Sequence, residues 1–222
     1  MKCVILCAGR GHRMESTIPK ALVPIKGKSL IYHVIEMWED AVDSFIFVVG
    51  HKWEEVVKSL PRGTPYIIQE PQKGIADAIY STKGLLRDEE FVVALGDCLQ
   101  VGQWDIPPNI KLGIGVWKTT NKDNIRRGYS VEVENNLVTK VVEKPKNPPN
   151  NYCGMGTYFL DGRIFNYIKR TKLNPIRNER EITDTIQLMI DAGEPITPVF
   201  FNGKYLNINY WNDIAEAEEL LR

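Results

Sequence analysis

The chain has 222 residues, and its 28 lysines and arginines balance 28 aspartates and glutamates. A balanced charge gives no global field that favours nucleic acid or an anionic membrane, so an anion site has to be local. Four cysteines without a C-x-x-C pair argue against zinc and a disulfide framework, and no apolar run approaches the ~18 residues of a membrane span. We therefore expect a cytoplasmic protein with one domain over residues 1–222 and without a nucleic-acid or membrane partner.

The first loop carries the strongest functional signal. An apolar strand at residues 4–7 runs directly into a glycine loop that contains Gly9 and Gly11. Such a loop lets successive backbone N–H groups converge on one point, which creates an anion site, and Arg13 and Lys20 add two cations. The combination predicts a polyphosphate-binding loop for a nucleoside triphosphate.

Two better-known glycine loops fit this stretch poorly. The dinucleotide fingerprint needs a third glycine where Met14 stands, and an acidic residue where the basic segment 50–52 follows the second strand. The Walker-type loop G-x-x-x-x-G-K-[ST] does not occur in the sequence. A dinucleotide-dependent oxidoreductase is therefore the least favoured of the functions considered.

The first half of the chain alternates strand-like and helix-like segments. Strands are predicted at residues 4–7, 45–49, 66–69 and 91–95, with helices at about 29–41, 53–60 and 74–86. This alternation favours βαβ units with parallel strands, whose ligands bind beyond the carboxyl ends. We therefore expect the loops at 8–20, 69–74 and 96–100 to share one rim.

The second half has the pattern of an antiparallel lobe. Strands are predicted at residues 112–117, 129–134, 137–143, 152–160 and 196–201 and near Leu206, with helices at about 161–169, 182–192 and 211–221. An Asn135-Asn136 turn indicates a hairpin. We expect an α/β fold with a Rossmann-like mixed, mainly parallel sheet flanked by helices and a smaller antiparallel lobe. The boundary near residue 103 divides the domain into halves 1–103 and 104–222.

The segment QEPQKG at residues 69–74 connects a strand to a helix. The Gln69 amide offers one acceptor and two donors, enough to pair with a pyrimidine edge, and Gly74 lets the backbone approach a flat base. An ordinary polar turn is the alternative.

Two segments carry oxygen ligands suited to Mg²⁺. Asp97 ends an apolar strand, where a carboxylate can hold Mg²⁺ against phosphates, and Asn207 and Asn209 lie on one face of a short strand before the last helix. The alternatives are a turn-capping aspartate and asparagines that serve turns and a helix cap. The sequence leaves open which asparagine would be the second ligand.

The strand at residues 137–143 ends in adjacent opposite charges, Glu143 and Lys144. Neighbours on a strand point to opposite faces, so we expect no pairing between them while the strand continues. If the strand opens here, both could turn into a pocket, where Glu143 would accept from sugar hydroxyls and Lys144 would meet a phosphate. Solvated surface charges are the alternative.

The order of these motifs resembles that of the sugar-1-phosphate nucleotidylyltransferases across nearly the whole chain. The matching motifs are A-G-x-G-x-R, P-K-A-L, Q-x-x-x-x-G, L-G-D, R-G-Y, V-V-E-K-P, G-x-G-T-Y, E-I-T-D and N-I-N-Y. The short interval from Arg13 to Lys20 is similar to that of the uridylyltransferase that makes UDP-N-acetylglucosamine. The E-K-P segment is closer to glucose-1-phosphate thymidylyl- and uridylyltransferases.

The resemblance implies roles for individual positions. A base-binding group would comprise Leu6, Ala8, Gly9, Gln69 and Gly74. Gly11 and Arg13 would bind the triphosphate, and Lys20 would bridge the α-phosphate and the sugar phosphate, so that Arg13 and Lys20 are the catalytic pair. The sugar phosphate would be held by Gly128, Glu143, Lys144 and Gly156, and Mg²⁺ by Asp97 and Asn207.

Three positions depart from the family pattern. His12 stands where a small Thr or Ser is common, Asn207 where many relatives have Asp, and Met155 where Thr or Asn often precedes the glycine. These departures bear on loop geometry, on the second metal ligand and on sugar specificity. We also expect a chain without the left-handed β-helix or dimerising extension of longer relatives, and a homo-oligomer is left open.

The resemblance implies transfer of a nucleoside monophosphate from a pyrimidine triphosphate, UTP or dTTP favoured, to a sugar-1-phosphate, with release of pyrophosphate. Because the sugar phosphate is already ionised, the reaction needs placement and charge neutralisation rather than a general base. One alternative is a pyrimidine nucleotidyltransferase that uses a polyol phosphate or phosphocholine. Another is a glycosyltransferase-like sugar-nucleotide-binding protein, although the Asp97 segment lacks the second acidic residue of the usual acid-x-acid metal motif.

Overall fold

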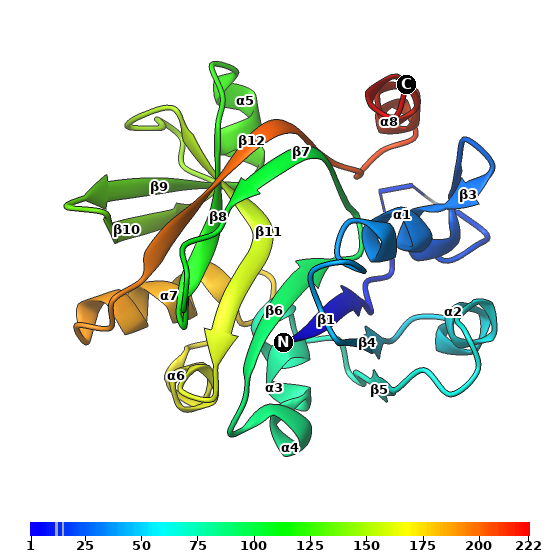
Figure 1. The fold of residues 1–222 in the computed structure, drawn as a ribbon, viewed down its shortest axis with the longest axis horizontal. Helices are drawn as coiled ribbons and strands as arrows, with labels where there is room; N and C mark the ends of the chain where they lie inside the picture. The colour runs from blue at the N-terminus through cyan, green and yellow to red at the C-terminus, as the bar shows by residue number, and fades with distance from the viewer. Residues whose placement is uncertain (12, 15) are drawn as a thin grey trace.

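The computed structural model describes residues 1–11, 13–14 and 16–222, which form a ten-stranded mixed sheet and a separate two-stranded one (Figure 1). The large sheet follows the order β5-β4-β1-β6-β11-β8-β12-β7, with β9 paired to β10 and β11. Its strands are β1 Lys2–Cys7, β4 Ser44–Val49, β5 Tyr66–Ile68, β6 Glu90–Leu95, β7 Cys98–Asp105, β8 Gly113–Lys118, β9 Tyr129–Glu134, β10 Leu137–Glu143, β11 Tyr152–Asp161 and β12 Thr197–Asn207. The small hairpin pairs β2 Pro24–Ile25 with β3 Lys28–Ser29.

Helices cover both faces of the large sheet. They are η1 Lys20–Leu22, α1 Leu30–Glu36, α2 Trp53–Ser59, α3 Ile75–Ser81, α4 Lys83–Leu86, α5 Lys122–Arg127, α6 Ile164–Arg170, α7 Ile182–Asp191 and α8 Asn212–Leu220. Alternate residues of β1 reach different cores: Val4 belongs to the core that includes residues of α3, α4, α6 and α7, whereas Ile5 belongs to the core that includes residues of α1 and α2. Among the described residues, no helix is long and apolar enough to cross a membrane.

The first half confirms the predicted parallel sheet. β1 pairs in parallel with β4 and β6, and β4 pairs in parallel with β5. Val4 and Ile5 are fully buried, as expected for a central strand that is covered on both faces. The carboxyl ends of β1, β5 and β6 therefore meet at one edge.

β11 joins the two halves of the sheet. Its residues 157–161 pair antiparallel with β6, residues 152–154 and 158–159 pair antiparallel with β8, and residues 153–154 pair antiparallel with β9. The predicted hairpin of β9 and β10 is confirmed, and Asn135 and Asn136 both take the positive φ angles that a tight primed turn requires.

The long β7–β12 ladder was not predicted. The predicted boundary at residue 103 falls inside β7, and the two strands expected at 196–201 and near Leu206 form the single strand β12. Gly102 and Gly203 face each other in this ladder, and a Cβ on Gly102 would lie 2.2 Å from the Asn202 carbonyl oxygen. Glycine normally weakens a strand pattern, but here it permits close approach of two backbones.

The helices differ from the prediction at two places. The helix expected at 74–86 is split into α3 and α4, with Thr82 at the junction. The short helix α5 was not predicted, although Asn121 is a favourable N-cap whose side chain accepts a 3.0 Å hydrogen bond from the Asp123 amide.

Replacement of Gly154 by alanine should destabilise the fold by about 1–3 kcal/mol or more, the cost of overpacking a buried site. A Cβ there would lie 1.9 Å from the buried Tyr129 ring. Gly84→Ala is the control, because a Cβ at that exposed helical position meets nothing within 4 Å and should be neutral or slightly stabilising. Urea unfolding of both variants checks the contrast, and equal midpoints would contradict it.

Candidate functional site

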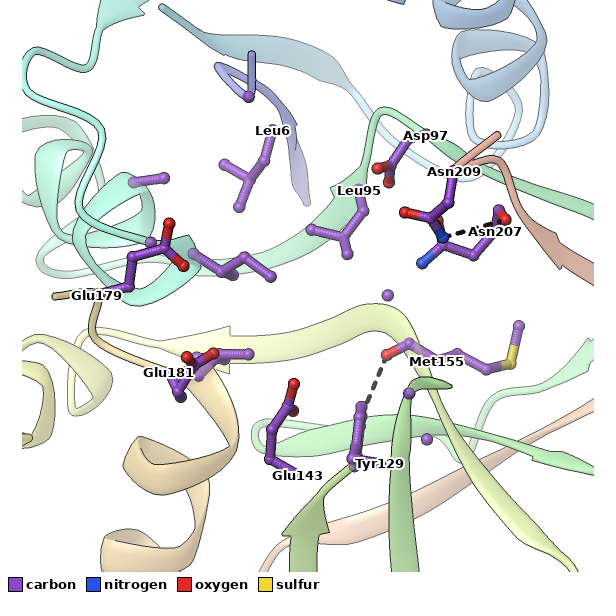
Figure 2. A pocket seen from close by; sticks show the side chains of 18 of the residues that line it. Leu6, Leu95, Asp97, Tyr129, Glu143, Met155, Glu179, Glu181, Asn207 and Asn209 are labelled. Atoms are coloured by element: carbon purple, nitrogen blue, oxygen red, sulfur yellow. Dashed lines mark hydrogen bonds between the residues drawn. The ribbon is translucent and has the colours of Figure 1, made fainter. Parts of the chain in front are cut away.

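A cavity of about 340 Å³ lies where the carboxyl ends of β1, β5 and β6 face the lobe formed by β9, β10 and β11. Figure 2 shows Leu6 and Leu95 on one side and Tyr129 and Glu143 on the other. The site residues predicted from the sequence line this cavity, except Gly11 and Lys20. Those lining it are Leu6, Ala8, Gly9, Arg13, Gln69, Gly74, Asp97, Gly128, Glu143, Lys144, Gly156 and Asn207.

Lys20 and Gly11 lie beside one another, next to the lining residue Asp97. Lys20 opens the short helix η1, and its ammonium forms a 2.6 Å ion pair with the Asp97 carboxylate. Gly11 has a φ of 62°, and a Cβ there would meet the Lys20 Cβ at 3.2 Å. The absence of a side chain on Gly11 therefore gives Lys20 room to reach Asp97. His12, which departs from the family pattern, lies outside the described residues.

Gln69 and Gly74 hold each other in the turn between β5 and α3. The Gln69 Nε2 group donates to the Gly74 carbonyl oxygen at 3.0 Å, and Gln69 is buried. Gly74 has a φ of 97°, which L side chains rarely adopt. Because the amide nitrogen is tied to the turn, Gln69 retains its oxygen Oε1 as an acceptor for a ligand in the cavity.

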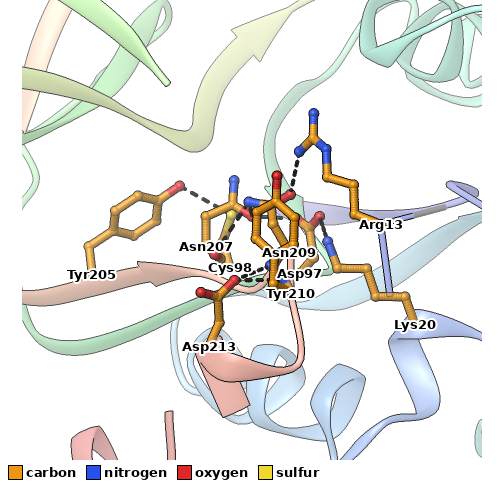
Figure 3. A network of polar contacts seen from close by, with 9 residues as sticks. All are labelled: Arg13, Lys20, Asp97, Cys98, Tyr205, Asn207, Asn209, Tyr210 and Asp213. Atoms are coloured by element: carbon orange, nitrogen blue, oxygen red, sulfur yellow. Dashed lines mark hydrogen bonds and ion pairs between the residues drawn. The ribbon is translucent and has the colours of Figure 1, made fainter. Parts of the chain in front are cut away.

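Figure 3 shows the polar contacts of Asp97, Asn207 and Asn209 with the cations Arg13 and Lys20. Arg13 donates to the Asn209 Oδ1 atom at 3.0 Å, and the Asn209 Nδ2 group donates to the Asn207 Oδ1 atom at 3.0 Å. Lys20 contacts one oxygen of Asp97, while the other lies 3.5 Å from the weak thiol donor of Cys98. These contacts form two neighbouring groups, one that joins Lys20, Asp97 and Cys98 and one that joins Arg13, Asn209 and Asn207.

This donor set suits Mg²⁺ that is shared with phosphates. Asp97 supplies a carboxylate and Asn207 a neutral oxygen, which are hard ligands, and Mg²⁺ usually takes only one or two carboxylates alongside phosphate oxygens. No group of three or more His, Cys, Asp or Glu side chains that could hold a metal alone occurs in the described part of the chain. The residues fit a metal that arrives with a nucleotide.

The strand β10 ends at Glu143, which frees both charged residues to face the cavity. Lys144 has a φ of 44°, and its backbone N–H donates to the Gly128 carbonyl oxygen at 2.9 Å. The Lys144 ammonium lies 3.4 Å from the Glu143 carboxylate. Strand geometry stops at Glu143, so the structure follows the predicted case in which the strand opens and both side chains line the cavity, where their charges lie close together.

The turn before α7 contributes residues that the sequence analysis did not assign. The Arg177 guanidinium lies 2.8 Å from the Glu181 carboxylate and 3.9 Å from that of Glu143, and Thr183 donates to Glu143 at 3.2 Å. Arg177, Glu179 and Glu181 line the cavity. Burial raises the pKa of the Glu181 carboxyl, and Arg177 opposes that shift. The E-I-T-D motif was the signal for Glu181, whereas no local pattern marks Arg177.

Two tyrosines fix the β11 segment that forms the cavity floor. The Tyr129 hydroxyl donates to the Met155 carbonyl oxygen at 3.1 Å, and the Tyr205 hydroxyl accepts from the Gly156 N–H at 3.1 Å. Burial raises the pKa of Tyr205 well above its ordinary value, so the hydroxyl keeps its proton. Sequence reasoning missed both roles because buried aromatic residues look like ordinary core.

The geometry places the chain among the α/β proteins that bind nucleotides beyond the carboxyl ends of parallel strands. The chain belongs to the nucleotidyl transferase family, whose pattern matches residues 2–222. The family predicted from the order of the motifs is thereby confirmed.

Curated relatives and solved structures agree with this assignment. The chain is 33% identical over 227 residues to the bifunctional protein GlmU of Methanocaldococcus jannaschii. The alignment covers 100% of this chain and 53% of GlmU. It is 30% identical to the UTP–glucose-1-phosphate uridylyltransferase AglF of Haloferax volcanii. This alignment covers 100% of this chain and 97% of AglF. A candidate glucose-1-phosphate thymidylyltransferase from Bacillus anthracis superposes with a TM-score of 0.86 at 25% identity, covering 100% of this chain and 95% of that one. The chain spans about half the length of the GlmU relatives.

Proposed function

We propose that this chain transfers a nucleoside monophosphate from a pyrimidine nucleoside triphosphate, UTP or dTTP favoured, to a sugar-1-phosphate. The products are a nucleoside-diphosphate sugar and pyrophosphate. The supporting observation is that one cavity is lined both by the glycine loop with Gln69 and by Gly128, Glu143 and Lys144. We infer that residues 1–222 act as one nucleotidyltransferase domain, because one sheet runs through both halves.

The proposed reaction is an in-line displacement. A phosphate oxygen of the sugar-1-phosphate attacks the α-phosphorus, the bond to the bridging oxygen breaks, and pyrophosphate leaves with the electron pair. No proton has to be removed from the attacking oxygen, so the residues supply position and positive charge. When bound by Asp97 and Asn207, Mg²⁺ would neutralise phosphoryl charge and orient both reactants.

Lys20 and Arg13 are proposed as the fixed cations of this step. An ammonium group has three donors, so Lys20 can keep its contact with Asp97 and still donate to phosphoryl oxygens on both substrates. Arg13 reaches the same cavity from the glycine loop, where a planar guanidinium suits phosphate oxygens. Glu143 would accept from sugar hydroxyls, and Lys144 would contact the sugar phosphate.

The orientation of Gln69 supports uracil or thymine as the base. With Nε2 bound to Gly74, the remaining Oε1 atom accepts a hydrogen bond. The N3 atom of uracil and thymine carries a hydrogen, whereas that of cytosine is itself an acceptor and would be repelled.

Gln69→Leu should therefore lower kcat/KM for UTP or dTTP by about tenfold to a hundredfold while changing kcat/KM for CTP much less, because a lost base contact costs about 1–3 kcal/mol. Gln72→Leu is the matched control, since Gln72 lines the same cavity but contacts Arg10. Initial rates with the three triphosphates give the ratios. If the ratio of kcat/KM for UTP or dTTP to kcat/KM for CTP changed only in the Gln72 variant, Gln72 and not Gln69 would be the residue that contacts the base.

Pyrophosphate release tests the proposed reaction. The assay combines UTP, dTTP, CTP, ATP and GTP, each with glucose-, N-acetylglucosamine-, galactose- and mannose-1-phosphate in the presence of Mg²⁺. Release that requires one pyrimidine triphosphate and one sugar phosphate supports the proposal. Release with glycerol-3-phosphate or phosphocholine instead would assign a different acceptor. Nucleoside diphosphate freed from a supplied nucleoside-diphosphate sugar, with no pyrophosphate from any triphosphate, would indicate glycosyl transfer.

A further inference from the structure

The segment between α6 and α7 carries Arg177, Glu179 and Glu181 into the cavity. It is a compact turn rather than a loose loop: the Asn174 N–H donates to the Glu179 carbonyl oxygen at 2.8 Å, and the Asn178 N–H donates back to the Asn174 carbonyl oxygen at 2.8 Å. Such a turn can shift as a unit. What fixes it to the rest of the protein therefore decides where Arg177 and Glu181 lie.

Arg180 fixes this turn to α3. Its guanidinium donates to the Asp77 carboxylate at 2.7 Å and to the Thr171 carbonyl oxygen at 3.0 Å. The second oxygen of Asp77 is buried and has no hydrogen-bond donor in the described part of the chain, so Arg180 is the partner that offsets the charge of this half-buried carboxylate. A side chain that joins a carboxylate on α3 to the backbone at the end of α6 closes the turn at both ends.

The backbone of Arg180 lies directly against the base-reading turn. Its N–H donates to the Lys73 carbonyl oxygen at 2.9 Å, and its carbonyl oxygen accepts from the Ala76 N–H at 3.4 Å. A Cβ at Gly74 would lie 2.6 Å from the Arg180 carbonyl oxygen. Gly74 in turn holds Gln69, so the contact extends from Arg180 to the proposed base reader.

We propose that Arg180, through its ion pair with Asp77, is a positioning residue that couples the base-reading turn at residues 69–74 to the sugar-phosphate side of the cavity. The coupling rests on the proposed function, because it assumes that Gln69 reads a base and that Arg177 and Glu181 face the second substrate. Arg180 is not among the described residues that line the cavity, so it acts through its neighbours. Loss of the Arg180–Asp77 ion pair should therefore increase the mobility of both the base-reading turn and the turn that carries Arg177 and Glu181.

Hydrogen–deuterium exchange tests the coupling without any substrate. In Arg180→Met, exchange should rise about tenfold both in peptides from residues 69–78 and in peptides from residues 172–182. Arg163→Met is the matched control, because Arg163 also holds its guanidinium in ion pairs, with Asp161 and Glu194, and does not line the cavity. Asp77→Asn keeps an acceptor for Arg180 and serves if the methionine variant does not fold. Faster exchange confined to residues 172–182, or an equal change in both arginine variants, would overturn the coupling.

Steady-state kinetics provide the second readout. With UTP and glucose-1-phosphate, or the pair that the pyrophosphate assay selects, Arg180→Met should raise both KM values about tenfold and leave kcat within about threefold. Arg180→Lys should keep the KM values between those of the wild type and Arg180→Met. Its ammonium can reach Asp77 but cannot also reproduce the guanidinium's hydrogen bond to the Thr171 carbonyl oxygen. Unchanged KM values with faster exchange would also overturn the coupling. A wild-type protein that is silent with every substrate pair would instead sink the proposed function, and the exchange result would still decide the role of Arg180.

Discussion

Lys20→Ala should lower turnover by about two to four decades, the range typical when one preorganised electrostatic group is lost. The side chain of Lys20 is only 13% exposed, and its ammonium forms an ion pair with Asp97. It packs beside Gly11, which has no side chain to obstruct it. Its charge is therefore fixed before substrates arrive, and no other side chain on η1 can replace it. Pyrophosphate release under saturating substrates measures the loss.

Lys28→Ala is the control for the Lys20 variant. Lys28 also forms an ion pair, with Glu36, but its side chain is 43% exposed on the surface, where such pairs contribute little. The control should keep the wild-type rate. A Lys20→Ala protein that is folded and retains more than about a third of wild-type turnover would remove Lys20 from the mechanism, because a loss that small is far below the expected range.

Asp97→Asn should lower turnover by at least about a hundredfold and raise the Mg²⁺ concentration needed for half-maximal rate. The substitution keeps the size of the side chain but removes the charge that faces both Lys20 and the proposed metal. Asn207 and Asn209 supply only neutral oxygens, so the variant would hold the cation through amides and substrate phosphates alone. A Mg²⁺ titration of the initial rate separates this effect from a general loss of activity.

Asp105→Asn is the control for the Asp97 variant, since Asp105 is an exposed carboxylate at the far end of β7. Its Mg²⁺ requirement and turnover should match those of the wild type. An Asp97→Asn protein with an unchanged Mg²⁺ requirement would mean that the carboxylate is a structural partner of Lys20 and not a metal ligand.

The parts of the site that follow single strands could be predicted from the sequence. The glycine loop after β1, Gln69 after β5 and Asp97 after β6 each stand at the end of an apolar run, and parallel strands bring such ends to one edge. Glu143 and Lys144 could also be predicted, because an apolar strand that ends in charged residues indicates the place where the chain turns.

The residues that act through distant contacts could not be predicted in this way. Arg180 meets Asp77 across 103 positions of sequence, and nothing near either residue indicates the other. The facing glycines Gly102 and Gly203 each weaken the local strand pattern, although together they make the β7–β12 ladder possible. Tyr205 looks like a core residue until its hydroxyl is seen to hold Gly156. Local patterns thus identify the ends of strands, whereas side-chain pairs between remote segments need the fold.

The most direct test of the proposed nucleotidyl transfer follows the phosphorus atom itself. The protein is incubated with Mg²⁺, the sugar-1-phosphate selected by the pyrophosphate assay, and either α-³²P- or γ-³²P-labelled UTP. Attack at the α-phosphorus predicts that the α label appears in a nucleoside-diphosphate sugar and the γ label in pyrophosphate, both lost in Lys20→Ala. Labelled inorganic phosphate, or an α label that remains in UTP or UDP while the sugar phosphate is consumed, would contradict the proposed reaction.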